Sequence, residues 1–131
     1  MTRPTRLLRK IGLWGPPLAY GYLIFYLSSL SHIPFASEAP DYLEHGVEYF
    51  SLAVLMARAL NDGLRHPVPL RTLVVALLLC VGYAATDEIH QMFVPDRFAD
   101  ITDVLSDAVG ASLGLATLRL AQGLLTRADA A

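Results

Sequence analysis

Hydrophobic residues fall into four long stretches that are separated by short polar segments. The stretches run from Ile11 to Leu30, from Val47 to Leu60, from Leu70 to Ala85 and from Val104 to Leu125. A helix that crosses the hydrocarbon core of a bilayer needs about 20 mostly apolar residues. The first and fourth stretches reach this length alone, and the other two reach it once their polar ends lie at the membrane interface. The pattern predicts an all-α bundle of four transmembrane helices, at about residues 11–30, 43–61, 69–93 and 101–125.

Composition supports this interpretation over two simpler ones. Of the 131 residues, 54% are hydrophobic and 17% are charged, against roughly 25% charged in soluble domains, so a soluble helical bundle is disfavoured. A cleaved signal peptide usually has an apolar core of about 7–15 residues, which is shorter than the first stretch here. No repeat or compositional boundary divides the chain, so residues 1–131 are predicted to form a single membrane domain. The single Cys80 excludes an internal disulfide.

Basic and acidic residues separate onto the two sides that four helices would create. With the N-terminus inside, nine of the ten basic residues fall on the inner side: Arg3, Arg6, Arg9, Lys10, Arg58, Arg65, Arg71, Arg119 and Arg127. Ten of the twelve acids fall on the outer side: Glu38, Asp41, Glu44, Glu48, Asp87, Glu88, Asp96, Asp100, Asp103 and Asp107. Because Lys and Arg accumulate in cytoplasmic segments, the sequence predicts that both termini lie in the cytoplasm.

The fourth predicted helix carries the most informative polar pattern. Asp100, Asp103, Asp107, Gly110 and Gly114 follow one another at steps of three and four residues, which places them on one face. The two glycines form the small-xxx-small pattern that lets another helix approach closely. The acidic face is therefore predicted to look into the bundle and away from lipid.

Two other predicted helices carry polar residues at the same outer level. They are Asp41, His45, Glu48 and Tyr49 on the second helix and Asp87, Glu88, His90 and Gln91 on the third. Together with Arg97, the only outer cation, and the acids of the fourth helix, these residues predict a polar cup at the outer leaflet. Ionisable residues near a membrane usually face the bundle interior or an aqueous cavity and are functional candidates.

The chemistry of such a cup stays open at this point. Neighbouring carboxylates are suited to general acid–base work, oxygen and imidazole ligands can hold a divalent cation, and Arg97 can bind an anion with two hydrogen bonds. Simpler explanations exist for several members. His45, Asp103 and Asp107 can serve only to lock helices together, His90 can be an interface residue, and Asp41 and Asp96 can be solvated loop charges.

The order and spacing of these motifs resemble the VanZ-like family of small bacterial membrane proteins. The resemblance rests on "HGVEYFSLAVL" and on "YAATDEIHQMFVPDRFADITDVLSDAVGASLG" and covers roughly residues 20–120. The family often has a lysine shortly before the histidine of its second helix, where this chain has Tyr42 to Glu44. The family's namesake confers resistance to teicoplanin more than to vancomycin, and teicoplanin carries an acyl chain and acts at the outer membrane face.

The resemblance implies a site in the bacterial cytoplasmic membrane that faces outside. Its expected partners are the lipid bilayer and a peptidoglycan precursor or lipoglycopeptide, not nucleic acid. Candidate catalytic residues are Asp87, Glu88, His45 and Asp103. Candidate substrate-binding residues are Arg97, Gln91, Glu48, Tyr49, His90, Asp100 and Asp107. Three functions remain open. The protein could be an enzyme that acts on an envelope or lipid-linked substrate, with or without a divalent cation. It could also be a non-enzymatic binder, or an ion or proton path.

Overall fold

The computed structural model describes residues 5–31 and 40–128, and within these ranges the chain folds into four α-helices with no strand. The helices are α1 (Arg6–Ser28), α2 (Asp41–Leu60), α3 (Leu70–Gln91) and α4 (Ile101–Ala128). The all-α prediction is therefore confirmed. Arg3 and Glu38, which took part in the charge pattern, lie outside the described residues.

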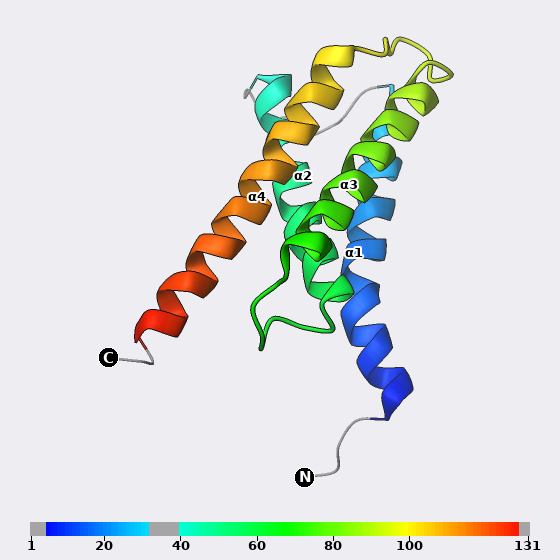
Figure 1. The fold of residues 1–131 in the computed structure, drawn as a ribbon. Coiled ribbons are helices and arrows are strands. Elements are labelled where there is room, and N and C mark those ends of the chain that lie inside the picture. The colour runs from blue at the N-terminus through cyan, green and yellow to red at the C-terminus, as the bar shows by residue number, and fades with distance from the viewer. Residues whose placement is uncertain (1–4, 32–39, 129–131) are drawn as a thin grey trace.

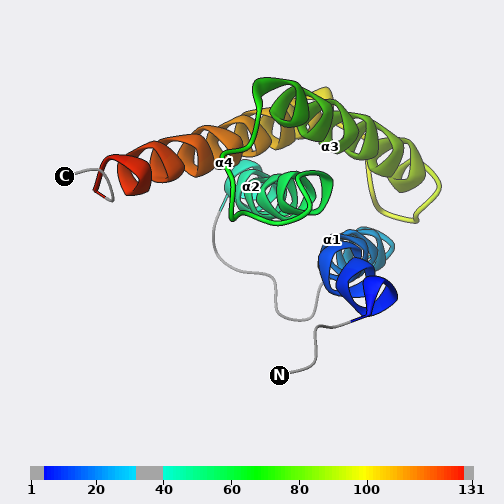
Figure 2. The same ribbon diagram turned by 60° about the horizontal axis from the view of Figure 1, so that its bottom comes forward.

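The helices run along a common direction and α2 lies among the other three. Figure 1 shows α1 beginning and α4 ending at one end of the molecule, with the connection between α3 and α4 at the other. Figure 2 shows α2 between α1 on one side and α3 and α4 on the other, and α2 contacts all three. The contact of α2 with α4 is the most extensive, and α1 meets α3 only slightly. The α2–α4 pair thus forms the main helix–helix contact of the fold.

The small residues of α4 explain why this pair is so close. A Cβ atom on Gly110 would lie 2.0 Å from the carbonyl oxygen of Gly46, and one on Gly114 would lie 2.5 Å from that of Phe50. Only hydrogen fits at either position, so the backbones of α2 and α4 touch directly. The predicted role of the Gly110–Gly114 pair in close helix packing is confirmed.

Helix α1 begins five residues earlier than predicted. Thr5 accepts a hydrogen bond from the backbone N–H of Leu8, and this cap lets the basic residues that follow form the first turns. The earlier start places Pro16 and Pro17 well inside the helix. Pro16 has no N–H to donate to the carbonyl of Gly12, which lies four residues before it. The guanidinium of Arg58 on α2 donates to that carbonyl instead, at 3.1 Å.

Two of the helices are long and apolar enough to cross a bilayer by composition. Among the described residues these are α3, over Leu70–Gln91, and α4, over Ile101–Thr126. Helix α1 opens with three basic residues, and α2 carries three acids in its outer half, which lowers their hydropathy. By this criterion α3 and α4 could each cross a membrane, and the bundle of four transmembrane helices stays a prediction.

Candidate functional site

A polar cavity of about 490 Å³ opens at the end of the bundle where α3 connects to α4. Side chains from α1, α2, α3, α4 and the α3–α4 connection line it. Its polar lining consists of Ser28, Ser31, Asp41, Glu44, His45, Glu48, Tyr49, Asp87, Gln91, Asp96, Arg97, Asp100 and Asp103. We call this the polar cavity. It brings together most members of the predicted cup.

His45 is held by the two aspartates of the α4 face. Its Nδ1 lies 3.1 Å from the Oδ1 of Asp107, and its Nε2 lies 3.9 Å from the Oδ2 of Asp103. Asp107 is 2% exposed, and it lies one turn from the point where Gly110 touches α2. The close backbone contact therefore sets the distance between the imidazole and its buried carboxylate.

The acids of α3 form a second hydrogen-bonded group. The amide of Gln91 donates to Glu88 at 3.2 Å and to Asp87 at 3.4 Å. Asp87 also accepts a hydrogen bond from the hydroxyl of Ser28 at 2.7 Å. All three α3 side chains are buried, so these bonds replace the water that the polar atoms would otherwise need.

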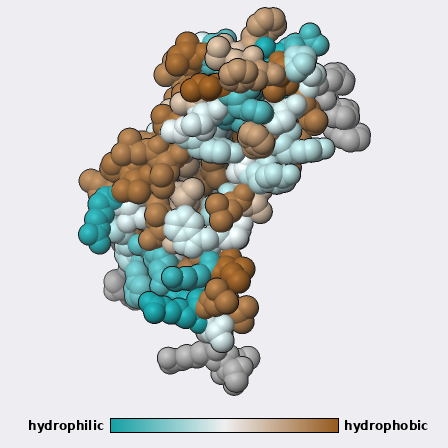
Figure 3. Space-filling model, turned by 90° about the vertical axis from the view of Figure 1, so that its right-hand side faces the viewer, coloured by the Kyte–Doolittle hydropathy of each residue, from teal (hydrophilic) through white to brown (hydrophobic). Residues whose placement is uncertain are grey.

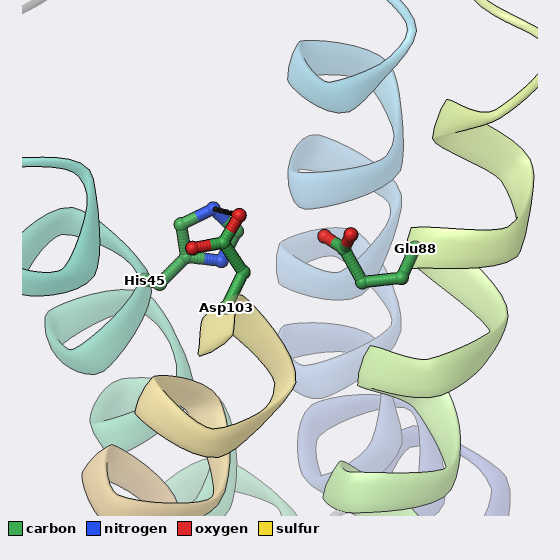
Figure 4. Close-up of side chains that lie close together, drawn as sticks. All are labelled: His45, Glu88 and Asp103. Atoms are coloured by element: carbon green, nitrogen blue, oxygen red, sulfur yellow. Dashed lines mark ion pairs between the residues drawn. The ribbon is translucent and has the colours of Figure 1, made fainter. Parts of the chain in front are cut away.

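Glu88 links this group to the start of α4 and points toward His45. One of its carboxylate oxygens accepts the backbone N–H of Asp100 at 2.9 Å. Figure 4 shows the Glu88 carboxylate directed from α3 toward His45 and Asp103. One oxygen or nitrogen atom from each of these three side chains lies within 4.8 Å of the corresponding atoms of the other two. This spacing would allow the three side chains to share one ligand.

Arg97 is positioned by a tight turn between α3 and α4. The backbone N–H of Arg97 donates to the carbonyl of Val94 at 3.2 Å, and Asp96 has a φ of 61°. Proline followed by a residue with positive φ is typical of a type II turn. The Arg97 side chain donates to the carbonyl of Leu30 at 3.2 Å and lines the polar cavity. Among the described carboxylates, none lies within 4 Å of the guanidinium, so it can receive an anionic group.

Asp100 has a structural role as well as a place in the cavity wall. Its carboxylate accepts the backbone N–H of Thr102 at 2.8 Å, which caps the first turn of α4. Hydrogen bonds from Thr102 hold the pKa of Asp100 below its usual value. The residue precedes the helix, so the predicted acidic stripe begins within the helix at Asp103.

Some predicted members lie apart from the cavity lining. His90 turns toward α1, where its ring packs on Phe25 at 4.4 Å between centroids and its Nε2 lies 3.0 Å from the hydroxyl of Ser29. Asp107 and Glu88 are buried and are not part of the cavity lining. Asp107 is hydrogen-bonded to His45 and Glu88 to Gln91, and both of these partners line the cavity. Asp41 and Asp96, predicted as solvated charges, are exposed but also line the cavity.

The contribution of α1 could not be predicted from the pattern of polar residues. Ser28 is 7% exposed and bonds to Asp87, 59 positions away in the chain. Serine is common at helix ends, so only its position at the end of α1 that lies level with the acids could have suggested this contact.

One polar atom of the site lacks a partner. The hydroxyl of Tyr49 makes no hydrogen bond with any residue that the structure describes, although Tyr49 is 1% exposed. Tyr49 lies one turn after His45 on the same face of α2 and lines the polar cavity. A buried, unpaired hydroxyl of this kind is rare in native proteins and marks a place where a ligand or water can bind.

Comparison with known proteins identifies the family. The family model described as VanZ/LLP1 matches residues 2–122, which is nearly the whole chain. Neither the curated proteins nor the solved structures contain a match. The match spans all the residues that form the polar cavity. The chain, with its four helices and its polar cavity at one end, therefore belongs to the VanZ/LLP1 family.

Proposed function

We propose that this protein acts at the outer face of the cytoplasmic membrane on the polar headgroup of a cell-envelope or lipid-linked substrate. The observation that carries the proposal is the polar cavity, to which all four helices contribute at one level of the bundle. Two of those helices are apolar enough to cross a membrane. A site of this kind suits a molecule that has a polar part and an acyl or prenyl part.

The distribution of side-chain size supports a bundle in which all four helices face lipid. Large apolar side chains are exposed on every helix, such as Leu18 at 64%, Val47 at 58%, Leu78 at 66% and Leu113 at 57%. The residues between helices are often small, as at Ala53, which is fully buried. Small interfaces with large residues outside are typical of membrane bundles. Figure 3 shows hydrophobic residues over much of one face and hydrophilic ones gathered toward the lower end.

The proposed orientation places the polar cavity outside and both chain ends in the cytoplasm. It rests on the separation of Lys and Arg from the acids. Single cysteines can test it in a Cys80→Ala background. We expect a membrane-impermeant maleimide to label a cysteine at Phe98 in intact cells, and to label one at His66 only after the cells are broken. The reverse pattern would contradict the orientation.

Within the cavity, the charges match a substrate that carries an anionic group. Arg97 would bind that group, and Asp87 or Glu88 would act as acid or base, since each is buried and lies among other carboxylates. His45 and Asp103 would orient these groups or the substrate. A lipoglycopeptide such as teicoplanin, or the peptidoglycan precursor that it binds, has the required combination of polar and apolar parts.

Antibiotic susceptibility provides the first test. A glycopeptide-sensitive bacterium would express the wild type, Glu88→Gln or Asp62→Asn at equal membrane abundance. Asp62→Asn is the matched control because it also removes one carboxylate, at the opposite end of α2. We expect protection against teicoplanin, greater than against vancomycin, from the wild type and the control only. Equal protection by Glu88→Gln would contradict a role of the cavity, and no protection by the wild type would exclude this substrate.

A non-enzymatic binder is the second candidate, and the unpaired Tyr49 hydroxyl favours it because it offers a bond to a captured ligand. Purified protein incubated with teicoplanin or with a lipid-linked precursor distinguishes the two. Mass spectrometry detects whether a product forms. Stoichiometric binding without a new product supports capture, whereas product formation supports an enzyme.

A further inference from the structure

We infer that His45, Glu88 and Asp103 bind one divalent cation in the wall of the polar cavity. The three side chains come from α2, α3 and α4, and their ligand atoms lie within 4.8 Å of one another. Figure 4 shows His45 and Asp103 next to each other, with the Glu88 carboxylate facing them from α3. No other group of three or more such side chains meets this spacing among the described residues.

The hydrogen bond between His45 and Asp107 prepares the imidazole as a ligand. An ionised carboxylate can only accept hydrogen bonds, so the proton of this bond belongs to Nδ1 of His45. When the ring carries that proton alone, Nε2 keeps its lone pair and faces Asp103. A carboxylate that fixes the tautomer and the ring orientation of a metal-binding histidine is a common feature of metal sites. Asp107, at 2% exposure, has this position.

The distance between the facing atoms leaves room for a shared ion. Nε2 of His45 and Oδ2 of Asp103 are 3.9 Å apart, which is too long for a hydrogen bond. Glu88 adds a third side chain that is itself buried. Three donors that each lie about 2.1 Å from one ion are about 3.4–3.6 Å from one another. The ligand atoms, which lie within 4.8 Å of one another, therefore have to close by up to about 1.4 Å to surround an ion.

The buried hydroxyl of Tyr49 is an independent indication that a ligand binds here. It lies on the same face of α2 as His45, lines the same cavity and lacks a partner among the described residues. Three protein ligands leave positions on the cation open, as in catalytic metal sites. A water or a substrate oxygen at an open position would lie in the cavity that Tyr49 also lines.

The donor set indicates which cation to use as a probe. One imidazole and two carboxylates suit Mn²⁺ or Zn²⁺ better than an all-oxygen ion such as Ca²⁺. Binding of Mn²⁺ alone can be measured without any substrate, so this inference can hold or fail independently of the proposed function.

The test uses the full chain, purified in detergent without a histidine tag and stripped of metal. Loss of the free Mn²⁺ signal in electron paramagnetic resonance gives stoichiometry and affinity, and Zn²⁺ competition tests whether both ions share the site. We expect one ion per chain. Affinity should fall by at least about tenfold in Glu88→Gln and in Asp103→Asn, because even partners outside the ligand set typically cost that much. Asp62→Asn, which removes a carboxylate at the opposite end of α2, should bind as the wild type does.

Folding of each variant is checked separately by the reactivity of Cys80, which is fully buried and should react with a thiol probe only on unfolding. Three results would overturn the inference. They are no stoichiometric binding by the folded wild type, unchanged affinity in both folded ligand variants, and an equal loss in Asp62→Asn. The first result would mean that the three side chains only hold α2, α3 and α4 together.

Discussion

Replacing Gly110 by alanine tests whether the α2–α4 contact holds the site together. The added Cβ would lie 2.0 Å from the carbonyl oxygen of Gly46, and real Cβ atoms essentially never approach closer than 3.0 Å. The two backbones must therefore move apart by about 1 Å. The bond between His45 and Asp107, at 3.1 Å and one turn away, would lengthen to about 4 Å, beyond hydrogen-bonding range.

The energetic cost follows from these two effects. Overpacking a tight contact costs about 1–3 kcal/mol, and leaving a buried polar group without its partner costs about 1–3 kcal/mol more. We expect Gly110→Ala to lower the free energy of unfolding by roughly 2–6 kcal/mol. Gly114→Ala, where the contact is 2.5 Å, needs a smaller movement and should cost less.

Cys80 provides the assay, because it is the only cysteine in the chain and is fully buried in the fold. A thiol-reactive fluorophore added to detergent-solubilised protein reports unfolding as temperature rises. The midpoint should fall by at least about 8 °C in Gly110→Ala, at about 4 °C per kcal/mol. Gly123→Ala on the same helix is the matched control, since nothing lies within 4 Å of its Cβ position. It should equal or slightly exceed the wild type. A Gly110→Ala midpoint equal to that of this control would refute the reasoning.

Two further predictions concern other parts of the bundle. Arg58→Met should lower the free energy of unfolding by about 1 kcal/mol. The loss should be smaller in a Pro16→Ala background, because the N–H of residue 16 can then donate to the Gly12 carbonyl. Equal losses in both backgrounds would contradict this role of Arg58. Asp100→Ala should lower the unfolding midpoint at pH 7, because the hydrogen bonds from Thr102 that lower the pKa of Asp100 stabilise the fold above the unfolded pKa of about 3.9. This contribution is lost as pH falls through the pKa of Asp100 in the folded protein. The unfolding midpoints of Asp100→Ala and of the wild type should therefore differ at pH 7 and lie closer together at pH 3.

Most of the helical framework could be predicted because hydrophobic length and charge are local properties. The face of α4 that meets α2 was also predictable, since Asp103, Asp107, Gly110 and Gly114 recur with helical spacing and only small residues permit close packing. The start of α1 was placed too late because its first turns are basic, and hydropathy does not register a threonine cap.

The interior of the candidate site was less predictable because it depends on contacts between distant residues. The sequence placed both His90 and Glu88 in the predicted cup, but the rotation of α3 turns His90 toward Phe25 on α1 and directs Glu88 toward His45. Such a rotation is set by packing on three neighbouring helices. The hydrogen bond between Ser28 and Asp87 depends on the same packing. A sequence pattern within one helix does not indicate such a contact between two helices.

The bond from Arg58 to the Gly12 carbonyl has a consequence for biogenesis. In the proposed topology, Pro16 leaves the Gly12 carbonyl of α1 without an intrahelical donor near the cytoplasmic interface, and Arg58 supplies the missing hydrogen bond. The donor lies on α2, which emerges from the ribosome later. We expect α1 to wait at the translocon until α2 arrives, so that the two helices enter the lipid together as a hairpin.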